Sequence, residues 1–412
     1  MTTPPARPPM LTLDEALVRL LGAIRPLPET DELSTFDARG RLLAVEVRSS
    51  LNVPPADNSE MDGYALRCAD VPVAGTTVLP VSQRIPAGVV GRPLEPGTAA
   101  RIFTGAQVPM GADAVVMQEQ CTAQEGGVRI DALPELGQSI RRRGEDVQEG
   151  SVVLAAGTRL TPQALGLAAS VGTASLRVAR RPRVAIFSTG DELAMPGEVL
   201  KPGAIYNSNR YTLRGLIEAL GGVCTDLGIV PDRLDATREA LRRAAEGQDL
   251  IVSCGGVSVG EEDHLRPAVE AEGRIDLWQI AIKPGKPLAF GEVRRSDAST
   301  AYFVGLPGNP VSSFVTFLLA VRPVLLRLQG ATDLVPRQSP QRADFDWPRP
   351  DRRREFLRVR RNERGGLDLF ANQSSGVLTS VVWGDGLVDN PPNQAIRAGD
   401  SVRFLSLAEL LA

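Results

Sequence analysis

The segment 249–266, DLIVSCGGVSVGEEDHLR, constrains the fold of this chain more than any other. Its apolar start predicts a buried strand, Gly255 and Gly256 begin a turn, and the acids at 261–263 are typical of a helix start. Glycines let backbone N–H groups approach an anion, and carboxylates beside them can hold a divalent cation against phosphate. The segment predicts a ligand-binding corner, although an ordinary strand-to-helix turn explains it equally well.

Strands that alternate with helices surround this segment and predict a separate α/β domain over residues 181–330. The expected strands are 183–187, 223–230, 250–252, 278–282, 288–290 and 301–304. The first expected helix is capped by Asn207 or Ser208 and ends at 220, and two more are expected at 234–246 and 311–328. Ligands bind such sheets at the carboxyl ends of the strands. The loops at 188–193, 232, 254–263 and 305–310 should therefore form one site.

The rest of the chain predicts three further parts. Residues 1–48 with 147–180 are expected to form an extended helical segment, with helices at 13–24 and 162–172. Short β-like runs broken by proline and glycine predict a small β domain at 49–146. Short strands at 355–359, 367–370, 377–382 and 401–405 predict a β barrel or sandwich at 331–412.

Composition excludes several classes of protein. The 412 residues are too many for one ordinary core, and the 46 basic and 49 acidic residues nearly balance. Because these charges balance, we expect the protein to bind neither nucleic acids nor a membrane surface. The 4% of aromatic residues also argues against stacking on bases. The N-terminus lacks the apolar region of a signal peptide, and no run of about 18 apolar residues is evident. We therefore expect a cytoplasmic protein.

The cysteines and the one histidine restrict the chemistry. Cys68, Cys121, Cys224 and Cys254 are scattered without CxxC spacing, which favours reduced thiols in a core over a disulfide framework or a zinc site. A histidine metal cluster or a Ser-His-Asp triad would have to be built around His264 alone. We therefore expect carboxylates and lysines to carry the chemistry.

Two loops of the predicted β domain carry charged side chains. The loop 51–65 is constrained by prolines and contains Asp62, and the loop 140–146 contains Arg141 and Asp146. An arginine fork beside acids can position an anion and a metal together. A simple turn at Asp62 and a solvated arginine face explain the same residues about as well.

Seven motifs follow one another along nearly the whole chain: DNSEMDGYA (57–65), RIFTGA (101–106), IRRRGED (140–146), FSTGDEL (187–193), CGGVSVGEEDH (254–264), IKPGKPLAFG (282–291) and GLPGNPVSS (305–313). In this order they resemble the molybdopterin molybdenumtransferase family, the bacterial molybdenum-insertion enzymes that are related to the E domain of gephyrin. The resemblance implies a multidomain α/β and β fold. Its parts are an extended helical segment, an inserted small β domain, a three-layer molybdopterin-binding α/β domain and a C-terminal β barrel.

The resemblance also implies a reaction and its partners. Adenylylated molybdopterin and molybdate would be the substrates; Mg²⁺-dependent cleavage of the pyrophosphate bond would leave molybdenum on the dithiolene and release AMP. Such a reaction requires mostly positioning and neutralisation of charge, and no covalent nucleophile. The implied assembly is an elongated homodimer with shared active sites, in contact with the adenylyltransferase of the pathway and with molybdoenzymes.

Matched position by position, the resemblance assigns roles to particular residues. Functional acids are expected at Asp62, Asp146, Glu192, Asp232 and Asp263, the last three as Mg²⁺ ligands. Molybdate is expected at Ser258, Lys283 and Lys286, with Arg354, Arg358, Ser374 and Ser375 as further oxyanion candidates. The other expected substrate-binding residues are Thr104, Arg141, Thr189, Gly190, Gly255, Gly256, Pro307, Gly308, Asn309 and Pro310. The chain departs from the family pattern at Glu60, His264 and Arg266.

Two other functions fit parts of the sequence. An adenylyltransferase of the same pathway uses the same α/β fold, but it needs neither the N-terminal acids nor the barrel. A peptide-binding scaffold like gephyrin is the other alternative, and no motif of this sequence indicates it.

Overall fold

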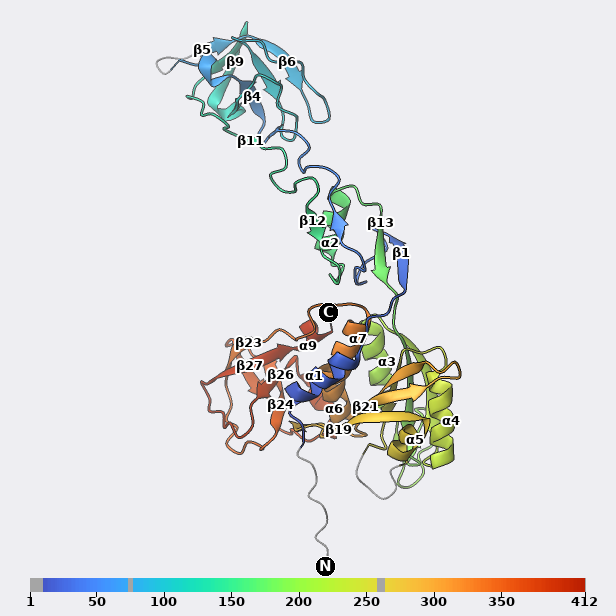
Figure 1. Ribbon diagram of the computed structural model, residues 1–412. Helices are drawn as coiled ribbons and strands as arrows, with labels where there is room; N and C mark the ends of the chain where they lie inside the picture. Colours follow the sequence, from blue (N-terminus) through green and yellow to red (C-terminus); the bar gives the residue numbers. More distant parts are fainter. Residues whose placement is uncertain (1–9, 73–76, 258–263, 412) are drawn as a thin grey trace, which may run out of the picture.

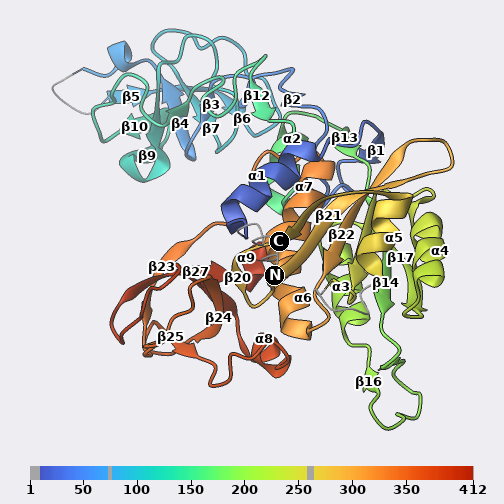
Figure 2. The same cartoon turned by 60° about the horizontal axis from the view of Figure 1, so that its bottom comes forward.

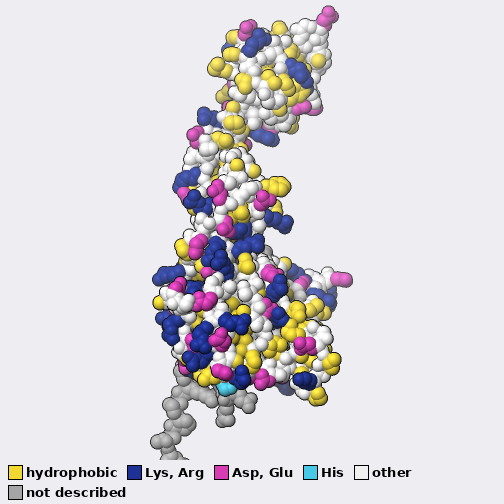
Figure 3. All heavy atoms as spheres, turned by 90° about the vertical axis from the view of Figure 1, so that its right-hand side faces the viewer, with side chains coloured by type: hydrophobic (Ala, Val, Ile, Leu, Met, Phe, Trp, Pro, Cys, Tyr) yellow, Lys and Arg dark blue, Asp and Glu magenta, His cyan; other side chains and the backbone are white. Residues whose placement is uncertain are grey.

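The computed structural model describes residues 10–72, 77–257 and 264–411. The chain is elongated: a β domain lies at one end, a narrow connecting segment follows, and a larger body of two parts lies at the other end (Figure 1). Basic and acidic side chains are interspersed along the visible face (Figure 3), as the nearly balanced composition leads one to expect. The multidomain α/β and β fold class is confirmed.

A six-stranded sheet forms the centre of the α/β domain, in the order β17-β14-β18-β22-β21-β19. Its parallel strands are β17 (Val223–Val230), β14 (Arg183–Thr189), β18 (Leu250–Cys254) and β22 (Thr300–Leu306), and β21 (Pro287–Arg294) and β19 (Gly273–Gln279) continue it in antiparallel pairing. All of β18 is buried, because helices cover both faces of the sheet. This is why its sequence is an unbroken apolar run.

The helices form one layer on each face of the sheet. One layer consists of α1 (Leu13–Ala23), α3 (Asn209–Ala219) and the helix Pro310–Leu328, whose side chains share a core with Val184, Val252 and Val304. The other layer consists of α4 (Leu234–Ala245) and α5 (Leu265–Glu272), which pack on the alternate strand residues Ala185 and Ile251. The predicted helix start at 261–263 lies outside the described residues, and the described helix α5 begins at Leu265.

The helix Pro310–Leu328 is long and apolar enough to cross a membrane by length and composition, which corrects the expectation that the chain has no such segment. Of the residues in its most apolar 18-residue window, 94% are buried within the fold, as in a core helix. Its three parts are α6 (Pro310–Thr316), a π-helical stretch (Phe317–Val321) and α7 (Arg322–Leu328). The π-helical stretch precedes Pro323, where the ring would clash with the carbonyl four residues earlier in a regular α-helix.

The connecting segment has a small core of its own. The strand β1 (Thr30–Ser34) pairs with β13 (Ser175–Ala179), and β2 (Val47–Arg48) pairs with β12 (Val152–Leu154). The helix α2 (Pro162–Ser170) begins at the Thr161 cap and packs on this core. By contrast, α1 precedes the segment in sequence and packs on the α/β domain.

The β domain consists of a four-stranded sheet, a three-stranded sheet and one short strand pair. The strands are β3 (Asn58–Ser59), β4 (Gly63–Leu66), β5 (Thr77–Leu79), β6 (Val81–Ile85), β7 (Ala99–Ile102), β8 (Ala114–Met117), β9 (Cys121–Gln124), β10 (Gly127–Ile130) and β11 (Ile140–Arg141). Two 3₁₀ turns, Cys68–Asp70 and Gln118–Gln120, connect them. Alternating buried residues of β4, β7 and β8 fill two separate cores, one on each face of the larger sheet.

The C-terminal part is a closed barrel, because β24 pairs with both β25 and β26. Its strands are β23 (Ser339–Ala343), β24 (Arg354–Arg361), β25 (Gly366–Leu369), β26 (Gly386–Asn390) and β27 (Ser401–Ser406). The short β20 (Ile282–Lys283) of the α/β domain pairs with β24, so the barrel lies against that domain (Figure 2). A last short helix, α9 (Leu407–Leu410), ends the described chain.

Two predicted strands are wrong. The residues 377–382 form a turn and the helix α8 (Thr379–Trp383), because this places the Ser380 hydroxyl and Val381 inside while Val382 is exposed. The expected strand 278–282 is divided between the end of β19 and the start of β20, which belong to different sheets.

Candidate functional site

A pocket of about 670 Å³ opens at the carboxyl edge of the parallel strands. The loops after β14, β17, β18 and β22 reach it, as the alternation of strands and helices predicts. The residues predicted from the sequence that line it are Thr189, Gly190, Glu192, Asp232, Gly255, Gly256, Pro307, Gly308, Asn309 and Pro310. The structure therefore brings together four loops that are widely separated in sequence.

Glycines allow the neighbouring strand ends to come close at this pocket. Gly255 has a φ of +94°, and a Cβ atom there would lie 2.6 Å from the carbonyl oxygen of Thr189. Gly190 has a φ of +144°, and a Cβ atom there would lie 2.5 Å from the Glu192 carboxylate. Any larger residue would push the strand ends apart or displace the acid. The glycine-rich sequences are thus explained by close approach of backbone and carboxylate.

Two of the predicted metal ligands, Glu192 and Asp232, share the pocket. The loops that carry them are joined, since the N–H of Asp232 donates to the Asp191 carboxylate at 3.1 Å. Carboxylate oxygens suit Mg²⁺, which commonly takes one or two of them and completes its shell with phosphate and water. Within the described ranges no three Asp, Glu, His or Cys side chains form a metal-binding group. The third expected ligand, Asp263, and the expected molybdate residue Ser258 lie outside the described residues.

Sequence reasoning missed one wall of the pocket. The segment from Ile205 to Asn209, which joins β16 (Ile205–Tyr206) to α3, lines the pocket together with Cys254 and Ser312. Of the two expected caps, Ser208 is the N-cap of α3 and makes no side-chain capping bond, whereas the Asn207 side chain accepts a hydrogen bond from the Arg210 N–H at 3.2 Å. The sequence Asn207-Ser208-Asn209 signalled a helix start. Its proximity to the loop after β22 depends on the packing of α3 in the fold.

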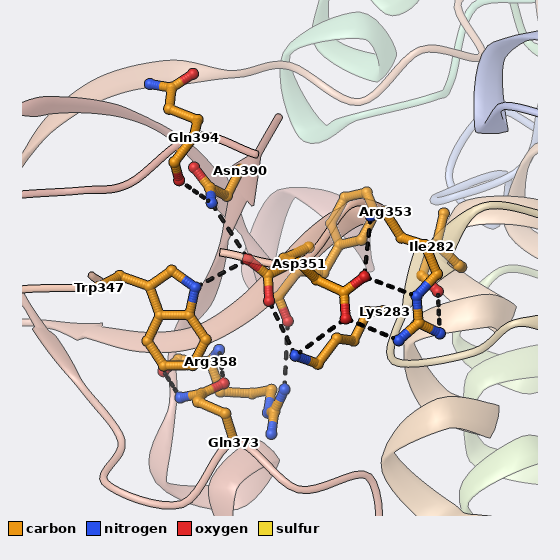
Figure 4. A network of polar contacts seen from close by, with 11 residues as sticks. Ile282, Lys283, Trp347, Asp351, Arg353, Arg358, Gln373, Asn390 and Gln394 are labelled. Carbon is orange, nitrogen blue, oxygen red and sulfur yellow. Dashed lines mark hydrogen bonds and ion pairs between the residues drawn. The ribbon is translucent and has the colours of Figure 1, made fainter. Parts of the chain in front are cut away.

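The two predicted lysines do not line this pocket. The ammonium group of Lys283 lies 3.1 Å from Glu355 Oε1 and 3.5 Å from Asp351 Oδ2, both in the barrel part (Figure 4). Glu355 is fully buried and also accepts a hydrogen bond from the Trp347 indole at 2.8 Å. Lys283 therefore lies at the junction between the α/β domain and the barrel and is not one of the residues that line the pocket.

The two barrel arginines proposed for an oxyanion differ in their surroundings. Arg354 forms ion pairs with Asp389 at 2.6 Å and with Asp14 of α1 at 3.0 Å, and the Asp389 carboxylate raises its pKa. Arg358 is only 1% exposed, and no described carboxylate lies within ion-pair distance of its guanidinium. Burial lowers the pKa of Arg358 to about 10. Arg358 is therefore a buried cation without a counter-charge in the described chain.

Neutral oxygen atoms hold the Arg358 guanidinium in place. It donates to the Ser380 hydroxyl at 3.2 Å, to the Phe356 carbonyl at 3.3 Å and to the Ser374 carbonyl at 3.2 Å. The next residue, Ser375, accepts a hydrogen bond from the Val311 N–H at 3.0 Å, and Gly376 lines the pocket. The loop 374–376 thus connects the buried arginine with the edge of the pocket.

The β-domain residues lie far from the pocket in the same chain. Asp62 accepts two hydrogen bonds from Thr104, through its N–H and its hydroxyl, both at 2.8 Å, and these bonds lower the pKa of Asp62. Arg141 and Asp146 belong to the loop at the base of the β domain. Figure 1 shows the β domain at the end of the chain that is opposite to the α/β domain. One chain alone therefore does not bring these four residues to the Glu192 and Asp232 carboxylates.

Three family models match successive parts of the chain. They are described as "MoeA N-terminal region (domain I and II)" at residues 11–172, "Probable molybdopterin binding domain" at 185–327 and "MoeA C-terminal region (domain IV)" at 341–407. A Mycobacterium tuberculosis protein named molybdopterin molybdenumtransferase 2 is 36% identical over 408 residues, which cover 95% of this chain and 97% of the relative. The chain belongs to the molybdopterin molybdenumtransferase family.

Other relatives agree with this membership. A molybdopterin molybdenumtransferase of Haemophilus influenzae is 44% identical over 324 residues, which cover 78% of each chain. The crystal structure of the molybdopterin biosynthesis MoeA protein of Pyrococcus horikoshii OT3 superimposes with a TM-score of 0.85 at 29% identity, covering 97% of this chain and all of that one. The resemblance stated from the sequence motifs is thereby confirmed.

Proposed function

We propose that this protein is a molybdopterin molybdenumtransferase of molybdenum cofactor biosynthesis. It would take adenylylated molybdopterin and molybdate, cleave the pyrophosphate bond, place molybdenum on the dithiolene and release AMP. The observation that carries this proposal is the pocket at the carboxyl edge, where glycine-rich loops and the Glu192 and Asp232 carboxylates meet in a chain of this family. The pocket is suited to binding a phosphate-containing molecule together with a cation.

The residues of the pocket suggest how the chain supports the reaction. Glu192 and Asp232 would hold Mg²⁺, which when bound neutralises charge on the pyrophosphate oxygens. The backbone at Gly255, Gly256 and Gly308 can approach phosphate oxygens closely, since no Cβ atoms intervene. Phosphoanhydride cleavage depends on this positioning and charge neutralisation more than on a nucleophilic side chain.

Molybdate binding is proposed for the junction between the pocket and the barrel. Arg358 supports this proposal because it is a buried cation without a described carboxylate partner, and an oxyanion would supply the missing charge. Lys283 borders the same junction through its contacts with Asp351 and Glu355. Lys286, Ser258, Ser374 and Ser375 remain candidates for the same role.

A homodimer with composite sites is proposed to explain the distant acids. In a two-fold dimer each site can draw Asp62 and Asp146 from the partner subunit. Asp62→Asn subunits mixed with Asp263→Asn subunits should then regain activity, because one of the two sites carries both changes and the other carries neither. If purified heterodimers remain as inactive as both folded parents, the composite site is wrong.

The reaction itself is tested by a product assay. Purified protein, adenylylated molybdopterin, molybdate and Mg²⁺ should yield AMP and molybdenum cofactor, and both products should depend on molybdate and on Mg²⁺. A protein that consumes ATP and molybdopterin to make the adenylylated compound would instead be the adenylyltransferase. We further propose a cytoplasmic location, which suits the four free cysteines, and contacts with the adenylyltransferase and with molybdoenzymes.

A further inference from the structure

Two side chains beneath the loop after β22 determine the direction of its peptide groups. Asn209, the first residue of α3, donates from Nδ2 to the Gly308 carbonyl oxygen at 2.6 Å and to Cys254 Sγ at 3.0 Å. The Cys254 thiol donates in turn to the Pro307 carbonyl oxygen at 3.3 Å. Cys254 is only 3% exposed, so water competes little for these bonds. The end of β18, the start of α3 and the loop therefore meet in one hydrogen-bonded cluster.

These bonds also decide where two N–H groups of the loop point. A trans peptide group is planar, and its N–H points away from its C=O. Because the carbonyls of Pro307 and Gly308 point to the cluster, the N–H groups of Gly308 and Asn309 point to the opposite side. In the described parts of the chain, neither N–H donates a hydrogen bond to another residue, and both residues line the pocket. Two adjacent N–H groups are thus left available to a ligand.

We propose that Asn209 and Cys254 are positioning residues that hold the Gly308 and Asn309 N–H groups in the direction required to bind a phosphate group of the substrate. Adjacent backbone N–H groups that point to one side form a concave site for an anion. The flanking Pro307 and Pro310 have no N–H, so the anion would be held at these two donors. The phosphate as ligand follows from the proposed function, whereas the direction of the N–H groups follows from the hydrogen bonds alone.

The inference can be tested without the complete reaction, using Asn209→Ala in the full-length protein. Hydrogen exchange followed by mass spectrometry should show faster exchange in peptides that cover 305–313, because the loop loses its anchor at the Gly308 carbonyl and the bonded N–H groups of Val311 and Ser313 open more often. By calorimetry AMP should bind about tenfold more weakly than to the wild type, as expected for a misdirected hydrogen bond to a charged group. Adenosine, which lacks the phosphate, should bind both proteins equally.

Two further variants separate positioning from general damage. Tyr211→Ala changes an exposed residue of the same helix and should alter neither exchange nor AMP binding. Cys254→Ser keeps a donor and an acceptor and should behave like the wild type, whereas Cys254→Ala should show part of the Asn209→Ala effect. The inference would be overturned if Asn209→Ala left the exchange rate at 305–313 unchanged, or if it weakened the binding of AMP and of adenosine equally. It would also be overturned if the wild type did not bind AMP. Failure of the wild type to release AMP in the product assay would instead refute the proposed function.

Discussion

Replacing Arg358 with methionine should separate stability from molybdate binding. Burial lowers the pKa of Arg358 to about 10, which corresponds to about 3 kcal/mol against the charged form in the folded protein. Methionine has a flexible chain that fits the same space and carries no charge. The substitution therefore removes a destabilising buried charge.

The hydrogen bonds lost with the guanidinium offset this gain. Three neutral oxygen atoms, on Ser380, Phe356 and Ser374, accept from the charged guanidinium of Arg358, and each such bond contributes about 1.5 kcal/mol. The loss is then about 4–5 kcal/mol, so the free energy of unfolding of Arg358→Met should lie about 1–2 kcal/mol below that of the wild type. If Arg358 served only the stability of the barrel, a much larger loss would be expected.

Thermal unfolding with and without molybdate measures both quantities in one experiment. Molybdate at about 100 times its Kd should stabilise the wild type by about 2.7 kcal/mol. It should stabilise Arg358→Met much less, because the variant lacks the buried cation that would balance the charge of the oxyanion. The matched control is Arg360→Met on the same strand, where the arginine is exposed, and this variant should respond like the wild type. An equal molybdate response in Arg358→Met would refute the reasoning, as would a loss of more than about 3 kcal/mol in its absence.

Three further outcomes follow from the structure. Gly285→Ala should destabilise the protein by about 1–3 kcal/mol in urea titrations, because a Cβ atom at a φ of +114° would overlap the Thr316 hydroxyl. As a control, Gly166→Ala in α2 should be neutral or stabilising, because nothing lies within 4 Å of a Cβ atom there. Burial raises the pKa of the Cys254 thiol to about 11. The unfolded chain therefore loses this proton at lower pH than the folded protein does, and the stability of the protein should fall as the pH rises from about 9 to 11. Cys254→Ser should lose less stability over this pH range, by up to about 2 kcal/mol in chemical denaturation; an identical pH dependence would contradict the assignment. Glu192→Gln should raise the Mg²⁺ concentration needed for AMP release at least about tenfold, and an unchanged requirement would exclude it as a ligand.

The sequence by itself determined the elements whose signals are local. Buried parallel strands are apolar along their whole length because helices cover both faces, and this pattern identified β14, β18 and β22. Their loops could be assigned to one edge because parallel strands all end on the same side of a sheet. The prediction that these loops form one site is confirmed, since ten residues that the family resemblance assigned to the site line the same pocket. The family motifs supplied the chemistry of that edge.

Tertiary structure decided the contacts between segments that have no local signal for each other. Lys283 pairs with Glu355 because β20 pairs with β24 of the barrel, and no spacing in the sequence predicts this pairing. The wall at 205–209 and the role of Asn209 depend on the packing of α3 against the loop after β22. The run 377–382 had the composition of a strand, yet it forms a turn and a helix in which the Ser380 hydroxyl accepts a hydrogen bond from the buried Arg358. The spacing of apolar residues along the sequence indicates which residues are buried. The partner of a buried charge depends instead on the course of the whole chain.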